Sequence, residues 1–451
     1  MKRLFIPLFL SLANCVNGQN STLENYIGEA FKNNQGLQGQ QLQLEKSMYA
    51  LKEARALFLP DISFGASYLK ADGGRTIDLP IGDLFNPVYK SLNELTHSTS
   101  FPNLQNQSIL LNPDNYYDAH FRTSLSLINS EIYYNEKIKN ENISQQKAAV
   151  NVYKRELVKE IKTAYYKYYQ AVKAEEIYNN ALTLVNENIR VNQSMVKNGL
   201  SNSTALTRSE TEKQKIEASI TQASGNRKNI EAYINFLINR PLESPVLLDT
   251  TSFISDSQLL NSIMNSNAEG REELQELQSV IQTQELNKKL QSAYMVPKLS
   301  TYLDLGSQGF KFQYNDKTQY YVWGLNLEMN LFAGGLHKSR IQEASVSKQA
   351  AETSYKETSS QMQMQLVQSV NNLRTAISDY YNAKSQLSLA EKYYSDQNKV
   401  YKAGQLLYIE LLDALTQLTN ARLQVAVTIA NVQVAYANTE RNAATYPLNK
   451  L

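Results

Sequence analysis

Two pairs of acidic residues are spaced so that their carboxylates could act together. Glu272 and Glu273 are neighbours, and Glu410 and Asp413 stand three residues apart. The first pair could serve as a general acid and base, but acidic residues are also favoured by the dipole in the first turn of a helix. We expect that second role. Residues three apart lie on nearly the same face of a helix, so Glu410 and Asp413 could concentrate negative charge on one face. The alternative is that both are ordinary solvated charges.

Other motifs of catalytic or metal-binding chemistry are missing from the sequence. His97, His120 and His337 are far apart, and none belongs to an H-E-x-x-H pair or another metal-binding spacing. There is no G-x-G-x-x-G, Walker or G-x-S-x-G motif. Gly334 and Gly335 could form a phosphate nest, but a bend from a strand into a helix fits them better. We therefore expect no enzyme activity, no cofactor and no metal.

The composition narrows the class of protein. The 451 residues carry a formal net charge of only +2, and no block of lysines and arginines stands out. The sequence thus gives no sign of a basic surface that would bind a nucleic acid. The sequence holds only 17 glycines and 10 prolines among many good helix formers. Such a composition favours long helices over an all-β or Rossmann-type domain.

The first residues predict export. A basic start is followed by a short apolar run over residues 4–13 and a suitable cut site before Gln19, which is the layout of a signal peptide covering residues 1–18. The single cysteine, Cys15, lies inside this segment. A lipoprotein cut before Cys15 is the alternative, disfavoured because the bulky Asn14 would precede it. Either cut leaves a mature chain with no disulfide to form.

Two long helical patterns dominate the chain. Apolar residues recur at steps of three and four over about 131–197 and again over 341–402, and no proline interrupts either run. A helix of about 65 residues is roughly 100 Å long. Helices of that length need partners along their whole course, which predicts antiparallel coiled-coil packing.

Each long helix is followed by a glycine and then by another helical pattern. Gly199 precedes the segment 204–237, and Gly404 precedes the segment 407–438. Glycine just past a helix end supplies the left-handed conformation that stops the helix. We therefore predict a helical hairpin at each glycine.

Four other segments alternate apolar and polar residues, as strands do. They are 61–68, 120–127, 299–305 and 321–331. No stretch after the leader approaches about 18 consecutive apolar residues, so we expect any membrane insertion to occur through these strands. Strands of about 9–11 residues, apolar outside and polar inside, build bacterial membrane barrels.

Four strands are too few to close a barrel. Two chains would supply eight, whose interior is filled by side chains, whereas three chains would supply twelve, enough for a water-filled lumen. We therefore predict a mainly α-helical protein with a shared 12-stranded membrane β-barrel in a homotrimer. A soluble β-sandwich lid on a coiled coil is the alternative.

The order helix, strand, strand, helix, helix occurs twice. We assign residues 19–240 to a first structural repeat, 241–265 to a linker and 266–451 to a second repeat. The connection over about 70–118 in the first repeat shows no clear periodicity, and we expect it to be a long extracellular loop.

Several short motifs occur in a fixed order on these predicted elements. They are Arg271-Glu272-Glu273-Leu274, W-G-L-N-L at 323–327 with L-F-A-G-G at 331–335, Y-K-A-G at 401–404, and E-L-L-D-A at 410–414 with A-R-L at 421–423. Together they resemble the outer membrane efflux protein family typified by TolC, over nearly the whole mature chain. One departure is Glu272, which stands where the family has proline.

The resemblance implies a homotrimer whose α-barrel crosses the periplasm and continues into a β-barrel in the outer membrane of a Gram-negative bacterium. Such a duct docks onto a periplasmic adaptor and an inner-membrane transporter, in an efflux or type I secretion system. The hairpin turns at Gly199 and Gly404 would contact the adaptor. Cargo, whether drug, metal ion or polypeptide, would pass through passively. The alternative is a periplasmic coiled-coil scaffold or adaptor without a pore.

The resemblance also implies a gate at the periplasmic mouth. Family members carry acidic residues just after the second hairpin glycine, and Glu410 and Asp413 match them, while Tyr401 matches a gate tyrosine. An arginine and an aspartate that help to close the mouth in TolC are replaced by Leu406 and Ala205. We therefore expect different contacts to hold the resting constriction.

Overall fold

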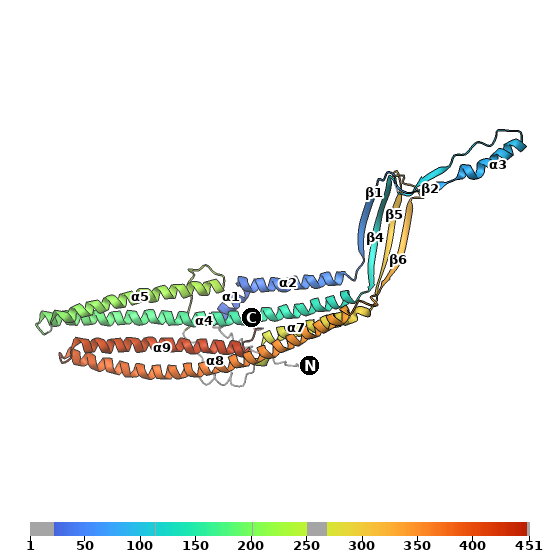
Figure 1. The fold of residues 1–451 in the computed structure, drawn as a ribbon. Coiled ribbons are helices and arrows are strands. Elements are labelled where there is room, and N and C mark those ends of the chain that lie inside the picture. Colours follow the sequence, from blue (N-terminus) through green and yellow to red (C-terminus); the bar gives the residue numbers. More distant parts are fainter. Residues whose placement is uncertain (1–21, 113, 201, 250–267, 449–451) are drawn as a thin grey trace, which may run out of the picture. The chain divides into compact units, whose positions relative to one another are not determined.

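The structure is a computed structural model, and it describes residues 22–112, 114–200, 202–249 and 268–448 (Figure 1). The expected signal peptide over 1–18, with Cys15 inside it, and the later part of the expected linker 241–265 lie outside these ranges. The chain divides into two compact units, one helical and one built around a sheet.

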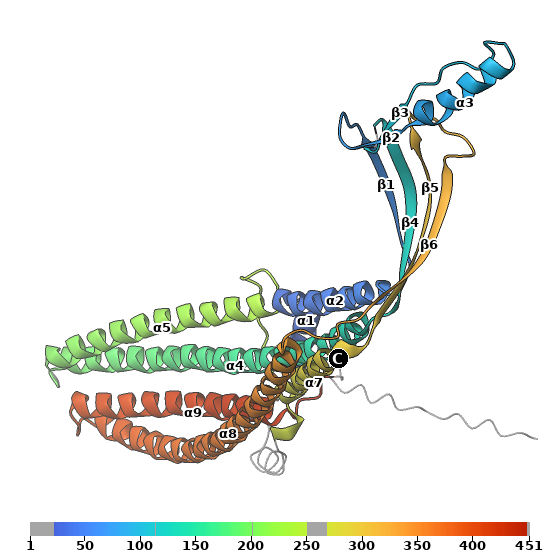
Figure 2. The same ribbon diagram turned by 45° about the vertical axis from the view of Figure 1, so that its right-hand side comes forward.

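The described part of the helical unit comprises residues 22–48, 141–200, 202–249, 268–283 and 348–448. Its helices, some of which continue into the other unit, are α1 (Thr22–Asn33), α2 (Gln35–Ala56), α4 (Ser130–Lys197), α5 (Ser203–Leu237), α7 (Glu272–Ser292), α8 (Leu336–Lys402) and α9 (Tyr408–Ala443). In both Figure 1 and Figure 2, α5 lies along α4 and α9 lies along α8. The predicted long helices are confirmed, although α8 begins before residue 341.

The helical unit has its main core where α1 and the start of α2 pack on α4 and the end of α5. Ile27, Leu37, Ile161 and Ile234 are fully buried in this cluster. Burying one such side chain stabilises a fold by about 1.5–3 kcal/mol. The apolar residues that recur at helical spacing in α4 up to Val172 therefore face this core, as their periodicity predicts.

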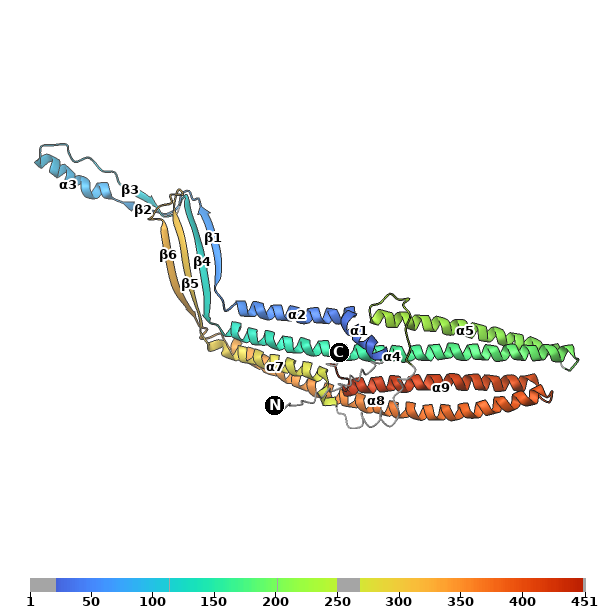
Figure 3. The same cartoon turned by 180° about the vertical axis from the view of Figure 1, so that it is seen from behind.

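The second unit, Tyr49–Asn140 with Gln284–Ser347, is built around a four-stranded antiparallel sheet in the order β1-β4-β5-β6. The strands are β1 (Asp61–Leu69), β4 (Tyr116–Ile128), β5 (Lys298–Phe310) and β6 (Gln319–Glu328). β1 and β6 form its two edges (Figure 3). The expected strand over 321–331 is corrected at its end, because the ladder stops where Glu328 pairs with Lys298, the first residue of β5.

The connection over 70–118 has more structure than the sequence suggested. β2 (Thr76–Leu79) pairs with β3 (Gln107–Leu110), and α3 (Ile81–Leu95) lies between them in the chain (Figure 1). The helix α3 is short and contains Pro87. This proline and those that flank the helix obscure its apolar periodicity in the sequence.

Among the described residues, no helix is both long enough and apolar enough to cross a membrane.

Candidate functional site

The two helical hairpins turn through the same backbone arrangement. Gly199 and Gly404 have φ of +73° and +72°, a region that glycine enters without the steric cost of a Cβ. At the first turn the N–H groups of Gly199 and Leu200 donate to the carbonyls of Val196 and Met195 at 3.1 and 2.8 Å. This is a Schellman motif.

The second turn repeats the pattern. The N–H groups of Gly404 and Gln405 donate to the carbonyls of Tyr401 and Val400 at 2.9 and 3.2 Å. Both turns therefore satisfy the free carbonyls of a long helix in the same way. The two predicted glycine turns lie at the ends of α4 and α8, where each hairpin reverses.

The two hairpin tips pack on each other through one apolar cluster, which we call the tip cluster. It joins α4, α5, α8 and α9, and its buried members are Ala181, Val185, Ile216, Tyr394, Tyr401, Tyr408, Leu411, Ala414, Leu415 and Leu418. Ala205 and Leu406 pack against it. The two positions that depart from TolC therefore contribute apolar contacts between the hairpins.

Tyr401 is buried inside the tip cluster. Its hydroxyl donates to Oδ1 of Asn192 in α4, and its ring lies 5.8 Å from that of Tyr408. Asn192 is fully buried and donates in turn to Oγ of Ser209 and the carbonyl of Ala205, both at 3.3 Å. Burial raises the pKa of Tyr401, so its hydroxyl stays a donor. This polar chain links the second hairpin to both helices of the first.

Sequence reasoning did not single out Asn192. The available signal was an asparagine that falls on the apolar face of a long helix, in step with Val185 and Ile189. A fully buried amide needs hydrogen-bond partners, and Tyr401 and Ser209 supply them.

Glu410 and Asp413 lie on the opposite side of α9 from the tip cluster. Both side chains are exposed, whereas Tyr408, Leu411 and Ala414 point inward. Asp413 accepts a hydrogen bond of 2.8 Å from the amide of Gln417 one turn further on. The structure therefore brings the two carboxylates to one exposed face, as their spacing predicts, and separates them from the buried Tyr401.

Gly334 and Gly335, the two glycines predicted to form a bend from a strand into a helix, lie between β6 and α8. Gly334 and Gly335 have φ of +56° and +84°, and α8 begins at the next residue. The Ser339 N–H donates to the carbonyl of Gly335 at 3.1 Å, as in the first turn of a helix. These two glycines occupy the transition from the extended chain to the helix.

The sheet has two chemically different faces. One carries Leu, Ile, Phe, Tyr and Trp side chains that are largely exposed, and on it Phe121 lies opposite Phe64 and Leu305 in the register. On the other face, Arg122 donates from Nε and Nη2 to the carboxylate of Asp304, each at 2.7 Å. The predicted alternation is therefore confirmed for the four strands of this sheet.

Comparison with known proteins finds a family match over part of the chain. Residues 264–442 match the model of the outer membrane efflux protein family. The match covers the second part of the chain. It supports an outer-membrane exit duct for efflux systems.

Solved structures of similar fold cover nearly the whole chain. The outer-membrane channel OprN has a TM-score of 0.73 and 14% sequence identity, covering 94% of this chain and 89% of OprN. CusC has the same score and identity, covering 94% and 92% of the two chains. VceC from Vibrio cholerae has a TM-score of 0.72 and 14% identity, covering 93% and 95%. No curated protein matches the sequence.

A buried layer of ion pairs joins the helices of the efflux protein away from the hairpin tips. Arg155 in α4 donates from Nε and Nη2 to the carboxylate of Glu272 at 2.5 and 2.6 Å, and from Nη1 to the carbonyl of Tyr446 at 2.9 Å. Lys162, two turns further along α4, donates from Nζ to the carboxylate of Glu440 in α9 at 2.6 Å. These contacts tie α4 to the start of α7 and the end of α9.

Glu273 belongs to the same layer. Its carboxylate accepts from Arg271 at 2.7 Å and from Arg441 of α9 at 2.6 Å. Burial disfavours the charged form, but the hydrogen bonds from the two arginines and the attraction to Arg441 outweigh it and lower the pKa of Glu273 to about 2. Glu272 and Glu273 both lie in the first turn of α7, as expected, and both act as ion-pair acceptors.

This geometry predicts a loss of stability in acid. The Glu273 carboxyl has its pKa lowered by folding, so its contribution is complete above the unfolded value of about 4.3 and disappears as the pH falls toward 2. We expect Glu273→Gln to cost about 2–3 kcal/mol at pH 7 and about half of that near pH 3. Thermal unfolding of the purified protein at both pH values measures this difference. The exposed Glu210→Gln in α5 is the control, and an equal cost of Glu273→Gln at both pH values would contradict the prediction.

Among the described residues, no group of three or more histidine, cysteine, aspartate or glutamate side chains could hold a metal ion.

Proposed function

We propose that three copies of this efflux protein form one passive exit duct through the outer membrane, supplied by an inner-membrane transporter through a periplasmic adaptor. The observation that carries the proposal is the sheet, whose apolar face is exposed in the single chain. Among its exposed side chains are Ile62, Phe64, Phe121, Leu305, Tyr321, Trp323, Leu325 and Leu327. An apolar surface of this size needs a covering, and lipid is the covering that a membrane strand meets.

The strand lengths support the same proposal. β1 has 9 residues, β6 has 10, and β4 and β5 have 13 each, against about 9–11 for a tilted strand that spans a membrane. The polar face with Arg122 and Asp304 would line a water-filled lumen. The edge strands β1 and β6 offer free backbone groups, which pairing between neighbouring copies would satisfy in a closed barrel.

The hairpin tips would form the periplasmic end of the duct and contact the adaptor around Gly199 and Gly404. Both turns have the same backbone geometry, so each copy would present two similar contact points. Glu410 and Asp413, exposed beside these turns, would form an acidic ring that favours cations at the mouth. Tyr401 would act from inside the tip cluster, by holding the two hairpins together.

The competing proposal is a periplasmic coiled-coil scaffold or adaptor without a pore. It accounts for the long helices, but it gives no role to a sheet with one apolar and one polar face. The two proposals differ in what they predict for the isolated protein.

We expect the full-length protein to stay with outer membranes through washes at high salt and alkaline pH. Mass measurement in mild detergent should then give three copies. Release by the alkaline wash would favour the scaffold, and a stable monomer inserted in the membrane would rule out the shared barrel. Trp323→Lys, on the apolar face, should reduce assembly, because a cation at mid-membrane on a lipid-facing strand costs about 2–4 kcal/mol. Tyr302→Lys on the polar face is the matched control.

A further inference from the structure

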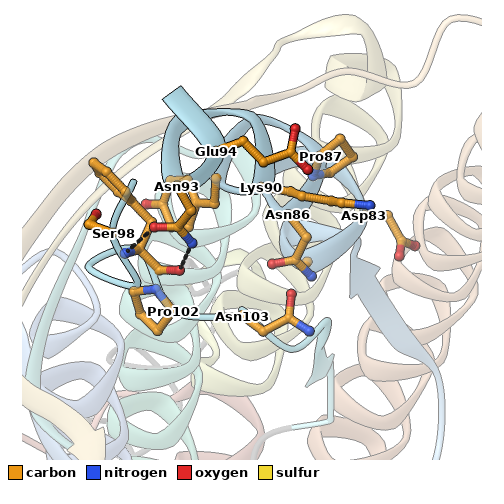
Figure 4. A pocket seen from close by; sticks show the side chains of 12 residues that line it. Asp83, Asn86, Pro87, Lys90, Asn93, Glu94, Ser98, Pro102 and Asn103 are labelled. Carbon is orange, nitrogen blue, oxygen red and sulfur yellow. Dashed lines mark hydrogen bonds between the residues drawn. The ribbon is translucent and has the colours of Figure 1, made fainter. Parts of the chain in front are cut away.

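The excursion between β1 and β4 holds a helix whose polar side is turned toward its own chain. The Asn86 side chain donates to the carbonyl of Leu104 at 2.9 Å and accepts from the Leu104 N–H at 2.7 Å. Asn93 makes the same pair of bonds with Phe101, at 2.9 and 3.1 Å (Figure 4). Two amides on one side of α3 thus bind the backbone of the extended segment that runs back toward β3.

Other contacts place the segment on the same side. A Cβ at Gly82 would lie 2.4 Å from the carbonyl oxygen of Leu104, so the helix and the segment approach closely there. Asn106 donates to the Asp83 carboxylate at 2.9 Å and accepts from the Asp83 N–H at 3.1 Å. A cavity of about 800 Å³ between α3 and the segment is lined by Asp83, Asn86 and Asn93, with Lys90 and Glu94 (Figure 4).

The apolar residues of α3 lie on the opposite face. At 100° per residue, six of them fall within an arc of about 100°. They are Ile81, Leu84, Phe85, Val88, Leu92 and Leu95. Leu84, Val88 and Leu95 are 65%, 52% and 79% exposed. A surface helix ordinarily buries its apolar face and shows water its polar one. In α3 the arrangement is reversed, so its apolar face requires a covering in the assembled protein.

We propose that this apolar face packs against the same face of α3 in neighbouring copies of the chain, an inference that rests on the proposed trimer. Ile81, Val88 and Leu95 recur at intervals of seven residues, with Phe85 and Leu92, also seven apart, between them. That is the spacing of a coiled-coil seam. A shared barrel would hold the three excursions at the same end of one assembly, where such a seam can form.

The charges of α3 fit a protein partner better than a lipid surface. Helices that lie on membranes are rich in lysine and arginine on their polar face. In α3 the single basic residue, Lys90, stands between the acidic Asp83 and Glu94. Oppositely charged side chains beside an apolar seam can pair between copies.

Cross-linking of introduced thiols tests the inference. Val88→Cys lies on the apolar face, and Lys90→Cys, two residues away and also exposed, is the matched control on the polar face. The parent chain, with its own Cys15, gives the background. On mild oxidation of isolated outer membranes, we expect roughly tenfold more disulfide-linked pairs of chains from Val88→Cys than from Lys90→Cys, because assembly holds the copies at millimolar effective concentration.

The copy number of the same samples separates the two proposals. A trimer in which Val88→Cys links no more than Lys90→Cys would overturn the pairing of α3 and leave the duct standing. A monomer would remove the duct and the inference together. Linkage of Val88→Cys to a protein of another mass, or quenching of a fluorophore on the introduced thiol by brominated lipid, would identify another occupant and overturn the pairing as well.

Discussion

Glu272→Ala is expected to lower the free energy of unfolding of the efflux protein by about 3–5 kcal/mol, because it leaves the Arg155 guanidinium buried without its partner. The two side chains are only 10% and 8% exposed. The lost carboxylate accepts two short hydrogen bonds. The remaining contact of Arg155, with the carbonyl of Tyr446, cannot neutralise the charge.

A matched substitution separates this effect from general damage to α7. Glu276, one turn further along, is half-buried and accepts only a 3.4 Å bond from Gln145. We expect Glu276→Ala to cost less than about 1 kcal/mol. Unfolding in denaturant, at one protein concentration and in one detergent, gives both values. Equal costs for the two variants would show that Arg155 and Glu272 are not energetically coupled.

The double variant Arg155→Met with Glu272→Leu adds a sharper test. Replacing a buried ion pair by apolar residues of similar volume is often neutral or stabilising. We therefore expect the double variant to recover most of the stability that Glu272→Ala loses. If it is as unstable as the single variant, then shape at this site contributes more than the unpaired charge does.

The helices and their turns could be predicted from the sequence because their causes are local. The apolar period of α4 persists through its whole length, and Gly199 ends the helix through bonds to Met195 and Val196, only a few residues away. The strands were found for the same reason, since alternation is visible within one segment. Their ends were predicted less well: β4 begins at Tyr116 and β5 ends at Phe310, beyond the expected segments, and β6 stops at Glu328, where β5 begins.

The partners of the buried polar residues could not be predicted, because they are far apart in the chain. Arg155 and Glu272 are separated by 117 positions, and Asn192 and Tyr401 by 209. A sequence shows that a charge or an amide falls on an apolar helix face, but the packing of distant helices determines which group meets it. The role of α3 was missed differently. The helix itself was not predicted, because it is short and contains Pro87, and its unusual orientation follows from the contacts of Asn86 and Asn93 with a later segment.

The acidic pair near the second hairpin turn has a geometry that suits a charged mouth. α9 begins at Tyr408, so Glu410 lies in its first turn, where the helix dipole favours a negative charge. Asp413 follows on the same exposed face. In the proposed trimer, two carboxylates from each of three copies would give about six around one constriction.

We therefore expect Glu410→Ala with Asp413→Ala to lower the cation selectivity of the channel severalfold in planar-bilayer recordings and to weaken its block by a trivalent cation. The control is Glu357→Ala with Asp379→Ala, which removes the same formal charge from exposed positions of α8 further from the turn. Charges that face open solvent are screened within roughly 8 Å at physiological salt, so the control should change neither property. If the first double variant assembles as a trimer but keeps its selectivity and its block, Glu410 and Asp413 are ordinary surface charges, and the selectivity of the duct must come from other residues, for which Asp304 on the polar face of the sheet is the next candidate.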